Sequence, residues 1–173
     1  PDLAVQRLTA RRIEKMRDPG GAVALARRAV PRKAPNRILF LRIASQFADE
    51  RAIPSFVRIA ARDFTSEAGQ LAATSLYFTA EKSLNEHFWL ASQAQSERLE
   101  ALRTQLGFEP FRTWLRNRRT DGTLRYVAAW AAGVLHDETA VPHLLKALEG
   151  GDTALATMAR FSLVALGKTE EVA

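Results

Sequence analysis

The stretch "HDETAVPHLLKAL" (residues 136–148) has a near twin, "ADERAIPSFVRIA" (residues 48–60), that starts 88 positions earlier (136 minus 48). Both contain an acidic pair, an alanine, a β-branched residue and a proline, followed by an apolar run. Asp49 and Asp137 are residues that commonly cap a helix, and proline is tolerated in the first turn because the first backbone N–H groups lack intrahelical partners. The pattern predicts that the same helix start is built twice.

The similarity extends to both sides of these stretches. At the 88-residue offset, residues 37–60 lie over residues 125–148, and each stretch places an apolar helix before the acidic cap. With one residue fewer in the offset, Ala72, Ser75 and Leu76 fall on Ala159, Ser162 and Leu163. Eighty-eight is twice 44, and repeats of roughly 40–47 residues made of paired helices are typical of stacked helical solenoids.

These residues resemble the HEAT-like repeat first described in phycobilin lyases. The second copy carries the family spelling at Ala140-Val141-Pro142, Leu144, Leu145, Leu148, Asp152 and Ala165-Leu166-Gly167. The resemblance is good over 124–168 and fair over 37–78, and it is not demonstrable over 1–17 and 84–119. Met158-Ala159 stands where the family usually has Val-Arg, so an arginine that commonly joins a ladder between repeats is absent.

The resemblance implies an all-α, HEAT-like solenoid of about ten helices in antiparallel pairs. We expect one domain over residues 1–173, with a long helix at 84–106 as a possible insertion. Other helices are expected at 71–79 and at the N-terminus, where Val5, Leu8, Ile13 and Met16 share a face. Since HEAT-like repeats occur in scaffolds, transport receptors, lyase subunits and DNA-binding enzymes, the resemblance specifies architecture more than activity.

Charge is distributed unevenly along the chain. Residues 1–62 contain 14 basic residues against 5 acidic ones, and residues 112–125 contain 5 against 1, whereas the other two regions are net acidic. Such asymmetry can attract nucleic acid, an anionic membrane or an acidic protein. Alternatively, it reflects a compositional preference for arginine and alanine.

Basic residues form three groups in which a partner or nucleic acid could bind. Two are stripes spaced for one helix face, and the third alternates with the aromatic residues Phe108, Phe111 and Trp114. Arginine forks bind phosphates and exposed rings stack on bases; alternatively, Phe111 and Trp114 point inward and the arginines are only solvated. The candidates are Arg7, Arg11 and Lys15; Arg51, Arg58 and Arg62; and Arg112, Trp114, Arg116, Arg118 and Arg119.

Motifs for catalysis are missing from the sequence. It contains neither a G-x-S-x-G elbow nor a phosphate-binding G-x-x-x-x-G-K-S/T loop, and His136 and His143 do not have the spacing of a zinc motif. We therefore expect no cofactor and no metal, and favour a non-catalytic scaffold or adaptor that binds a protein partner, with an acidic protein among the candidate partners. The alternatives are a nucleic-acid-binding protein, with DNA repair among its candidate roles, and, from the resemblance alone, a subunit that holds a chromophore.

The sequence says less about cellular compartment and about processing of the chain. The chain has no cysteine and no apolar run long enough for a membrane span. These features suit a cytoplasmic protein, although many exported proteins also lack cysteine. The chain begins at Pro1 rather than at methionine, which is compatible with a truncated or processed N-terminus.

Overall fold

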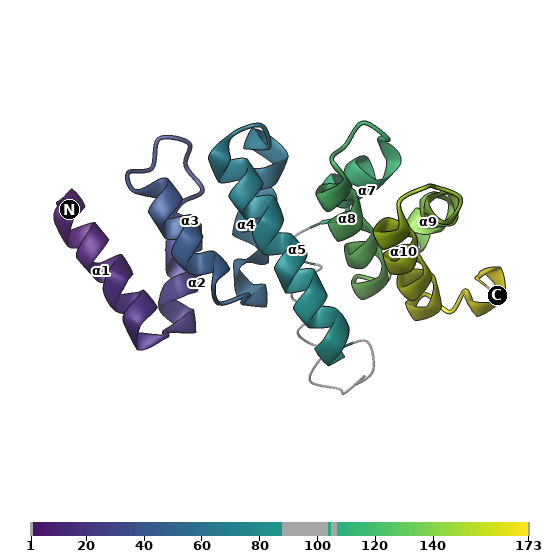
Figure 1. The fold of residues 1–173 in the computed structure, drawn as a ribbon, viewed down its shortest axis with the longest axis horizontal. Helices are drawn as coiled ribbons and strands as arrows, with labels where there is room; N and C mark the ends of the chain where they lie inside the picture. The colour runs from purple at the N-terminus through teal and green to yellow at the C-terminus, as the bar shows by residue number, and fades with distance from the viewer. Residues whose placement is uncertain (1, 88–103, 105–106, 173) are drawn as a thin grey trace. The chain divides into compact units, whose positions relative to one another are not determined.

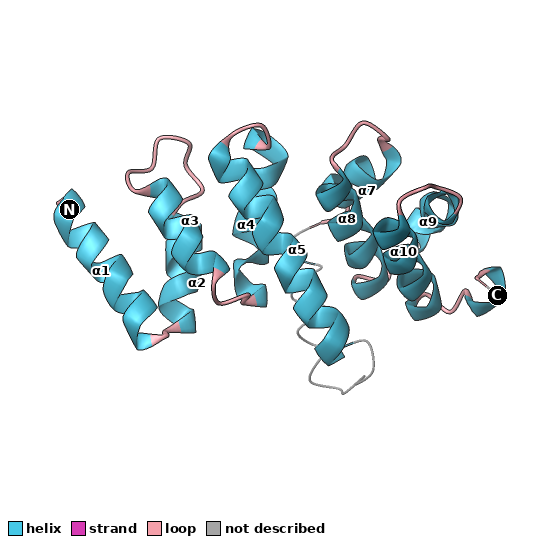
Figure 2. Ribbon diagram, viewed as in Figure 1, coloured by secondary structure: helices cyan, strands magenta, loops and turns pink. Residues whose placement is uncertain are grey.

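A computed structural model describes residues 2–87, 104 and 107–172, and these form nine α-helices and three short 3₁₀ turns, without strands (Figures 1 and 2). The all-α prediction is confirmed for this part of the chain. Contacts divide the chain into two compact units, Pro1–Thr79 and Ala80–Ala173. Within the described residues, no helix combines the length and the apolar character needed to cross a membrane.

The first unit begins with α1 (Leu3–Met16), which packs against α2 (Pro19–Arg28) and α3 (Arg37–Ser45). A 3₁₀ turn, η1 (Glu50–Ala52), then leads into α4 (Ile53–Asp63). The core of α3 and α4 consists of apolar side chains that recur at helical spacing and are almost completely buried: Phe40, Leu41, Ile43, Ile53, Phe56 and Ile59. Burying each of these side chains contributes about 1.5–3 kcal/mol to folding.

The helix α5 (Glu67–His87) crosses the boundary between the units. The sequence predicted a helix over 71–79 and a separate one from residue 84, but the structure joins residues 67–87 in one helix. No glycine or proline occurs between Thr79 and Leu84 to interrupt it. The remainder of the predicted long helix, from residue 88 to 106, lies almost entirely outside the described residues.

The second unit is built around α8 (Gly122–Val134), in which nine of the 13 residues are buried. It packs against α7 (Glu109–Arg116) and α10 (Thr153–Ala165), and α10 also packs against α9 (Val141–Leu148). Two 3₁₀ turns complete the unit: η2 (Glu138–Ala140) precedes α9, and η3 (Thr169–Glu171) follows α10. The order of elements from α7 to α10 is therefore the same as from α2 to α5.

The twin stretches fold alike. Ala48 and His136 have left-handed backbone conformations, with φ values of 44° and 52°. In each copy the following aspartate accepts a hydrogen bond from the backbone N–H two residues later, at 2.9 Å for Asp49 and 3.2 Å for Asp137. A 3₁₀ turn follows, and the proline is then the second residue of an α-helix. The repeated spelling therefore specifies a repeated local structure.

The match also holds in the helix that follows. Ala72, Ser75 and Leu76 of α5 are buried, and so are their counterparts Ala159, Ser162 and Leu163 in α10. In the second unit the hydroxyl of Ser162 donates to the carbonyl of Ala129, 2.7 Å away, and so joins α10 to α8. Ser75 donates instead to the carbonyl of Leu71 in its own helix. The two copies share a burial pattern but differ in this hydrogen bond.

Candidate interaction surface

The structure divides the eleven predicted binding residues into two groups. Six of them are engaged in contacts within their own unit or are buried: Arg7, Arg11, Arg51, Arg62, Arg112 and Trp114. The other five are exposed, and their side chains have no hydrogen-bond or ion-pair partner in the described part of the chain: Lys15, Arg58, Arg116, Arg118 and Arg119. Within the first group only Arg11, Arg51 and Arg112 are paired with a carboxylate, because Arg7 and Arg62 bond to neutral oxygens and keep their charge.

The basic stripe of α1 is partly used to hold the first unit together. The guanidinium of Arg7 donates to the side-chain oxygen of Asn36, 2.8 Å away, at the start of α3. Arg11 forms an ion pair with Glu14 at 3.0 Å, and Gln46 donates to the same carboxylate from beyond α3. The Arg11 and Gln46 hydrogen bonds lower the pKa of Glu14. In this stripe only Arg11 is neutralised by a carboxylate, whereas Arg7 is held by a neutral amide and Lys15 is exposed without a partner in the described residues.

The second predicted basic stripe is divided between two elements, because Arg51 lies in η1 whereas Arg58 and Arg62 lie in α4. Arg51 forms two hydrogen bonds with the carboxylate of Asp49, the cap of η1, and these bonds raise the pKa of the arginine. Arg62 donates to the carbonyl of Val30 in the connection between α2 and α3. Arg58 alone extends into solvent without a partner in the described residues.

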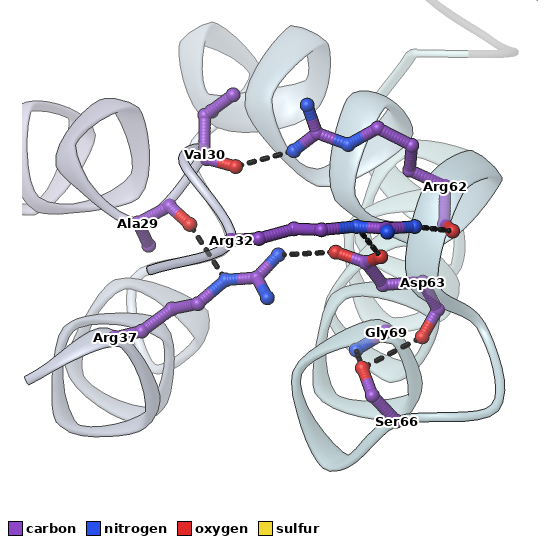
Figure 3. A network of polar contacts seen from close by, with 8 residues as sticks. All are labelled: Ala29, Val30, Arg32, Arg37, Arg62, Asp63, Ser66 and Gly69. Carbon is purple, nitrogen blue, oxygen red and sulfur yellow. Dashed lines mark hydrogen bonds and ion pairs between the residues drawn. The ribbon is translucent and has the colours of Figure 1, made fainter. Parts of the chain in front are cut away.

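A network around Asp63, which the sequence did not predict, joins the end of α4 to the α2–α3 connection and to the start of α3 (Figure 3). The carboxylate of Asp63 accepts from Arg37 at 2.8 Å and from Arg32 at 2.5 Å. Arg37 also donates to the carbonyl of Ala29, and Arg32 to that of Arg62. The Arg37 hydrogen bond in particular lowers the pKa of Asp63. Partners 26 and 31 positions apart (63 minus 37 and 63 minus 32) leave no local sequence signal.

In the second unit the Arg112 side chain forms contacts within the fold. Its guanidinium donates to both carboxylate oxygens of Asp137, at 2.7 and 2.8 Å, and so ties α7 to the turn before α9. The same guanidinium lies 4.8 Å from the centre of the Phe108 ring, within the range of a cation–π contact. The hydrogen bonds to Asp137 raise the pKa of Arg112. Because the two guanidinium N–H groups are already bonded to both oxygens of one carboxylate, the Arg112 guanidinium cannot bind a phosphate in the same two-pronged way.

The aromatic residues of this segment face inward. Trp114 is 7% exposed and Phe111 is 3% exposed, and their rings meet edge to face with centroids 5.6 Å apart. Neither ring can stack on a base outside the protein, so we leave Trp114 out of the candidate surface. Arg116, Arg118 and Arg119 are exposed at the end of α7 and in the following loop, and they form the basic part of this segment that a partner could reach.

The outer face of α1 carries several exposed large apolar side chains. Only Ala10 of this helix is fully buried. Val5, Leu8 and Met16, three of the residues that the sequence placed on one face, are 54%, 71% and 65% exposed. At 100° per residue, Arg12 lies between Leu8 and Val5 around the helix, and Lys15 is on the same side as Leu8. Large apolar side chains rarely stay exposed together without a partner.

Comparison of the chain with known protein families, curated proteins and solved structures gives no significant match. The HEAT-like resemblance therefore stays a prediction about the family, whereas the repeated local structure is an observation. Within the described residues, no three histidine or acidic side chains come close enough to hold a metal ion.

Proposed function

We propose that this chain is a helical-repeat scaffold of HEAT-like type that binds a protein partner and has no catalytic activity of its own. The observation that supports this proposal best is the outer face of α1, with Val5, Leu8 and Met16 more than half exposed. Covering the exposed part of such a side chain stabilises a complex by about 1 kcal/mol. Val5 and Leu8 are one turn apart and Met16 lies two turns further along α1, and side chains of this kind supply the apolar contacts that the centre of a protein interface commonly contains.

A repeat architecture suits this role. Stacked helix pairs bury their apolar faces against their neighbours, so surface residues can vary without loss of the core. The twin stretches and the buried residues of α5 and α10 supply the repeated framework. The exposed residues of α1 are not part of this repeated framework. The order of elements is the same in α2–α5 and in α7–α10, and α1 comes before the first of these two sets.

Co-purification tests the scaffold proposal. The tagged chain is incubated with extract of its own source organism, treated with nuclease, and recovered under mild conditions. We expect one protein to be retained in near-stoichiometric amount after the nuclease step. Recovery of the chain without any retained protein would refute the proposed function.

Nucleic-acid binding is the second candidate, and Arg116, Arg118 and Arg119 favour it. They are exposed, they are close together in sequence, and no carboxylate in the described residues pairs with them. If they contact phosphates, the logarithm of the affinity for duplex DNA falls by about 0.9 per contact for each tenfold increase in salt.

Binding of duplex and single-stranded DNA at low salt tests this candidate. Substitution of all three arginines with glutamine should reduce the salt dependence, whereas Arg160→Gln, at an exposed site on α10, should leave it unchanged. Absence of binding to either form of DNA at low salt would eliminate the candidate.

A further inference from the structure

The two sides of α1 have different properties. On the inner side, Ala10 is fully buried and Glu14 pairs with Arg11 and Gln46, so this side is used in the packing of the first unit. The outer side carries Val5, Leu8, Thr9, Arg12, Lys15 and Met16, all exposed. We call these six residues the α1 outer face.

Apolar residues on the α1 outer face follow helical spacing. Val5 and Leu8 are one turn apart, and Met16 lies two turns beyond Leu8, so the three side chains form a stripe along the helix. Val5 and Met16 are 11 residues apart (16 minus 5), which corresponds to about 16 Å of helix. A second helix lying alongside α1 can cover a stripe of this length with residues spaced at every third or fourth position.

Charge on this face has one sign. Arg12 and Lys15 lie within or beside the stripe, and neither has an ion-pair partner in the described residues. The two acidic residues of this region are used elsewhere, since Asp2 accepts from the backbone N–H of Ala4 to cap the helix and Glu14 lies on the opposite side. A partner that complements this face therefore carries carboxylates beside an apolar stripe.

We infer that the α1 outer face binds an acidic amphipathic helix of the partner protein. This inference rests on the proposed function and specifies the chemistry of the partner. The apolar stripe distinguishes such a helix from nucleic acid, which would meet the cations but leave Val5, Leu8 and Met16 in water. A membrane surface is less suited, because α1 contains no aromatic residue of the kind that anchors interfacial helices and its other side is packed against α2 and α3.

A designed peptide tests the inference with the whole chain. The probe is a labelled helical peptide of about 20 residues, with leucine at every third or fourth position and glutamate flanking this stripe. A peptide with lysine in place of every glutamate is the control. We expect the acidic peptide to bind with a dissociation constant on the order of 10 µM, measured by fluorescence polarisation, and the basic peptide to bind at least about tenfold more weakly.

Substitutions locate the site. Leu8→Asp should weaken binding of the acidic peptide by about tenfold or more, since it removes an apolar contact and adds repulsion. Val164→Asp, at a residue of α10 that is 49% exposed, adds the same charge elsewhere and should leave the affinity unchanged. Arg12→Glu with Lys15→Glu should also weaken binding, whereas Arg118→Glu with Arg119→Glu changes the net charge equally and should not.

Several results would overturn the inference: no binding of the acidic peptide, equal binding of the basic one, or unchanged affinity of the Leu8→Asp variant. Recruitment of the chain to phosphatidylserine vesicles, lost in the Leu8→Asp variant, would assign the face to a membrane instead. Failure of the inference differs from failure of the scaffold proposal. If the co-purified protein stays bound to the Leu8→Asp variant, the scaffold proposal stands and the partner uses another surface.

Discussion

The contact between α8 and α10 leaves no room for a side chain at Gly133. A Cβ atom at this position would lie 2.8 Å from the Cα of Ser162 and 2.9 Å from its Cβ and Oγ atoms. Two of these three atoms cannot rotate away, because they are the Cα and Cβ of a neighbouring helix. Gly133→Ala therefore forces the two helices apart by several tenths of an ångström.

Two opposing effects determine the size of the change. Alanine is intrinsically favoured over glycine in a helix by up to about 1 kcal/mol, and by less here because Gly133 is the penultimate residue of α8. Overpacking of a tight contact costs about 1–3 kcal/mol. Separation of the helices also lengthens the buried hydrogen bond from Ser162 to Ala129, which contributes about 1 kcal/mol. We expect a net destabilisation of about 2 kcal/mol.

Thermal and urea unfolding measure this change. Circular dichroism follows the helices, and we expect the midpoint of the variant to fall by roughly 4–8 °C. Gly122→Ala is the matched control, because it is in the same helix and its Cβ would meet only the Asp152 carboxylate, at 3.6 Å. The control should stay within about 0.5 kcal/mol of the wild type. A Gly133→Ala variant as stable as the wild type would refute the tight contact.

Three further predictions follow from the polar and close contacts. Gly69→Ala should prevent stable folding of the first unit, or lower its unfolding midpoint more than any surface substitution, because the new Cβ would lie 2.0 Å from the carbonyl oxygen of Asp63; a normal melting curve would contradict this. Arg112→Gln should lower the unfolding midpoint and Arg116→Gln should not, since only Arg112 pairs with Asp137; equal midpoints would contradict the structural role of Arg112. Burial acts to raise the pKa of Asp137, but hydrogen bonds from Arg112 and Thr139 outweigh burial, so the pKa is lowered. The ionised Asp137 carboxylate therefore stabilises the folded state above about pH 4, and this stabilisation is lost as the pH falls through the folded-state pKa. Urea unfolding as a function of pH should show a smaller loss of stability at acid pH for Asp137→Asn than for the wild type, and identical pH profiles would contradict this.

The repeated local structure could be predicted because it depends on neighbours in sequence. An aspartate cap, a 3₁₀ turn and a proline in the first helical turn use contacts within a few residues, as at Asp137 and Pro142. The inward alternative for Phe111 and Trp114 was also visible in the sequence, because both rings recur at helical spacing with Leu115. What spacing cannot decide is whether a shared face points into the protein or out of it.

The unpredicted features depend on residues far apart in the chain. Arg112 and Asp137 are 25 positions apart, and the arginines around Asp63 come from the α2–α3 connection (Arg32) and from the start of α3 (Arg37). The basic residues of α1 lie along one helix, but Arg51 belongs to η1 and does not share α4 with Arg58 and Arg62. Sequence could not show which of these residues are already bonded to Asn36, Asp49 or a backbone carbonyl. For the same reason, the apolar face of α1 could be listed as a stripe without its exposure being known.

Hydrogen exchange of the chain with its co-purified partner tests the central claim most directly. The account predicts that amides of α1 (Leu3–Met16) exchange more slowly in the complex, and that this protection disappears in the Leu8→Asp variant. Unchanged exchange of α1, with protection confined to the arginine-rich loop at residues 116–119, would contradict the account and favour the alternative surface.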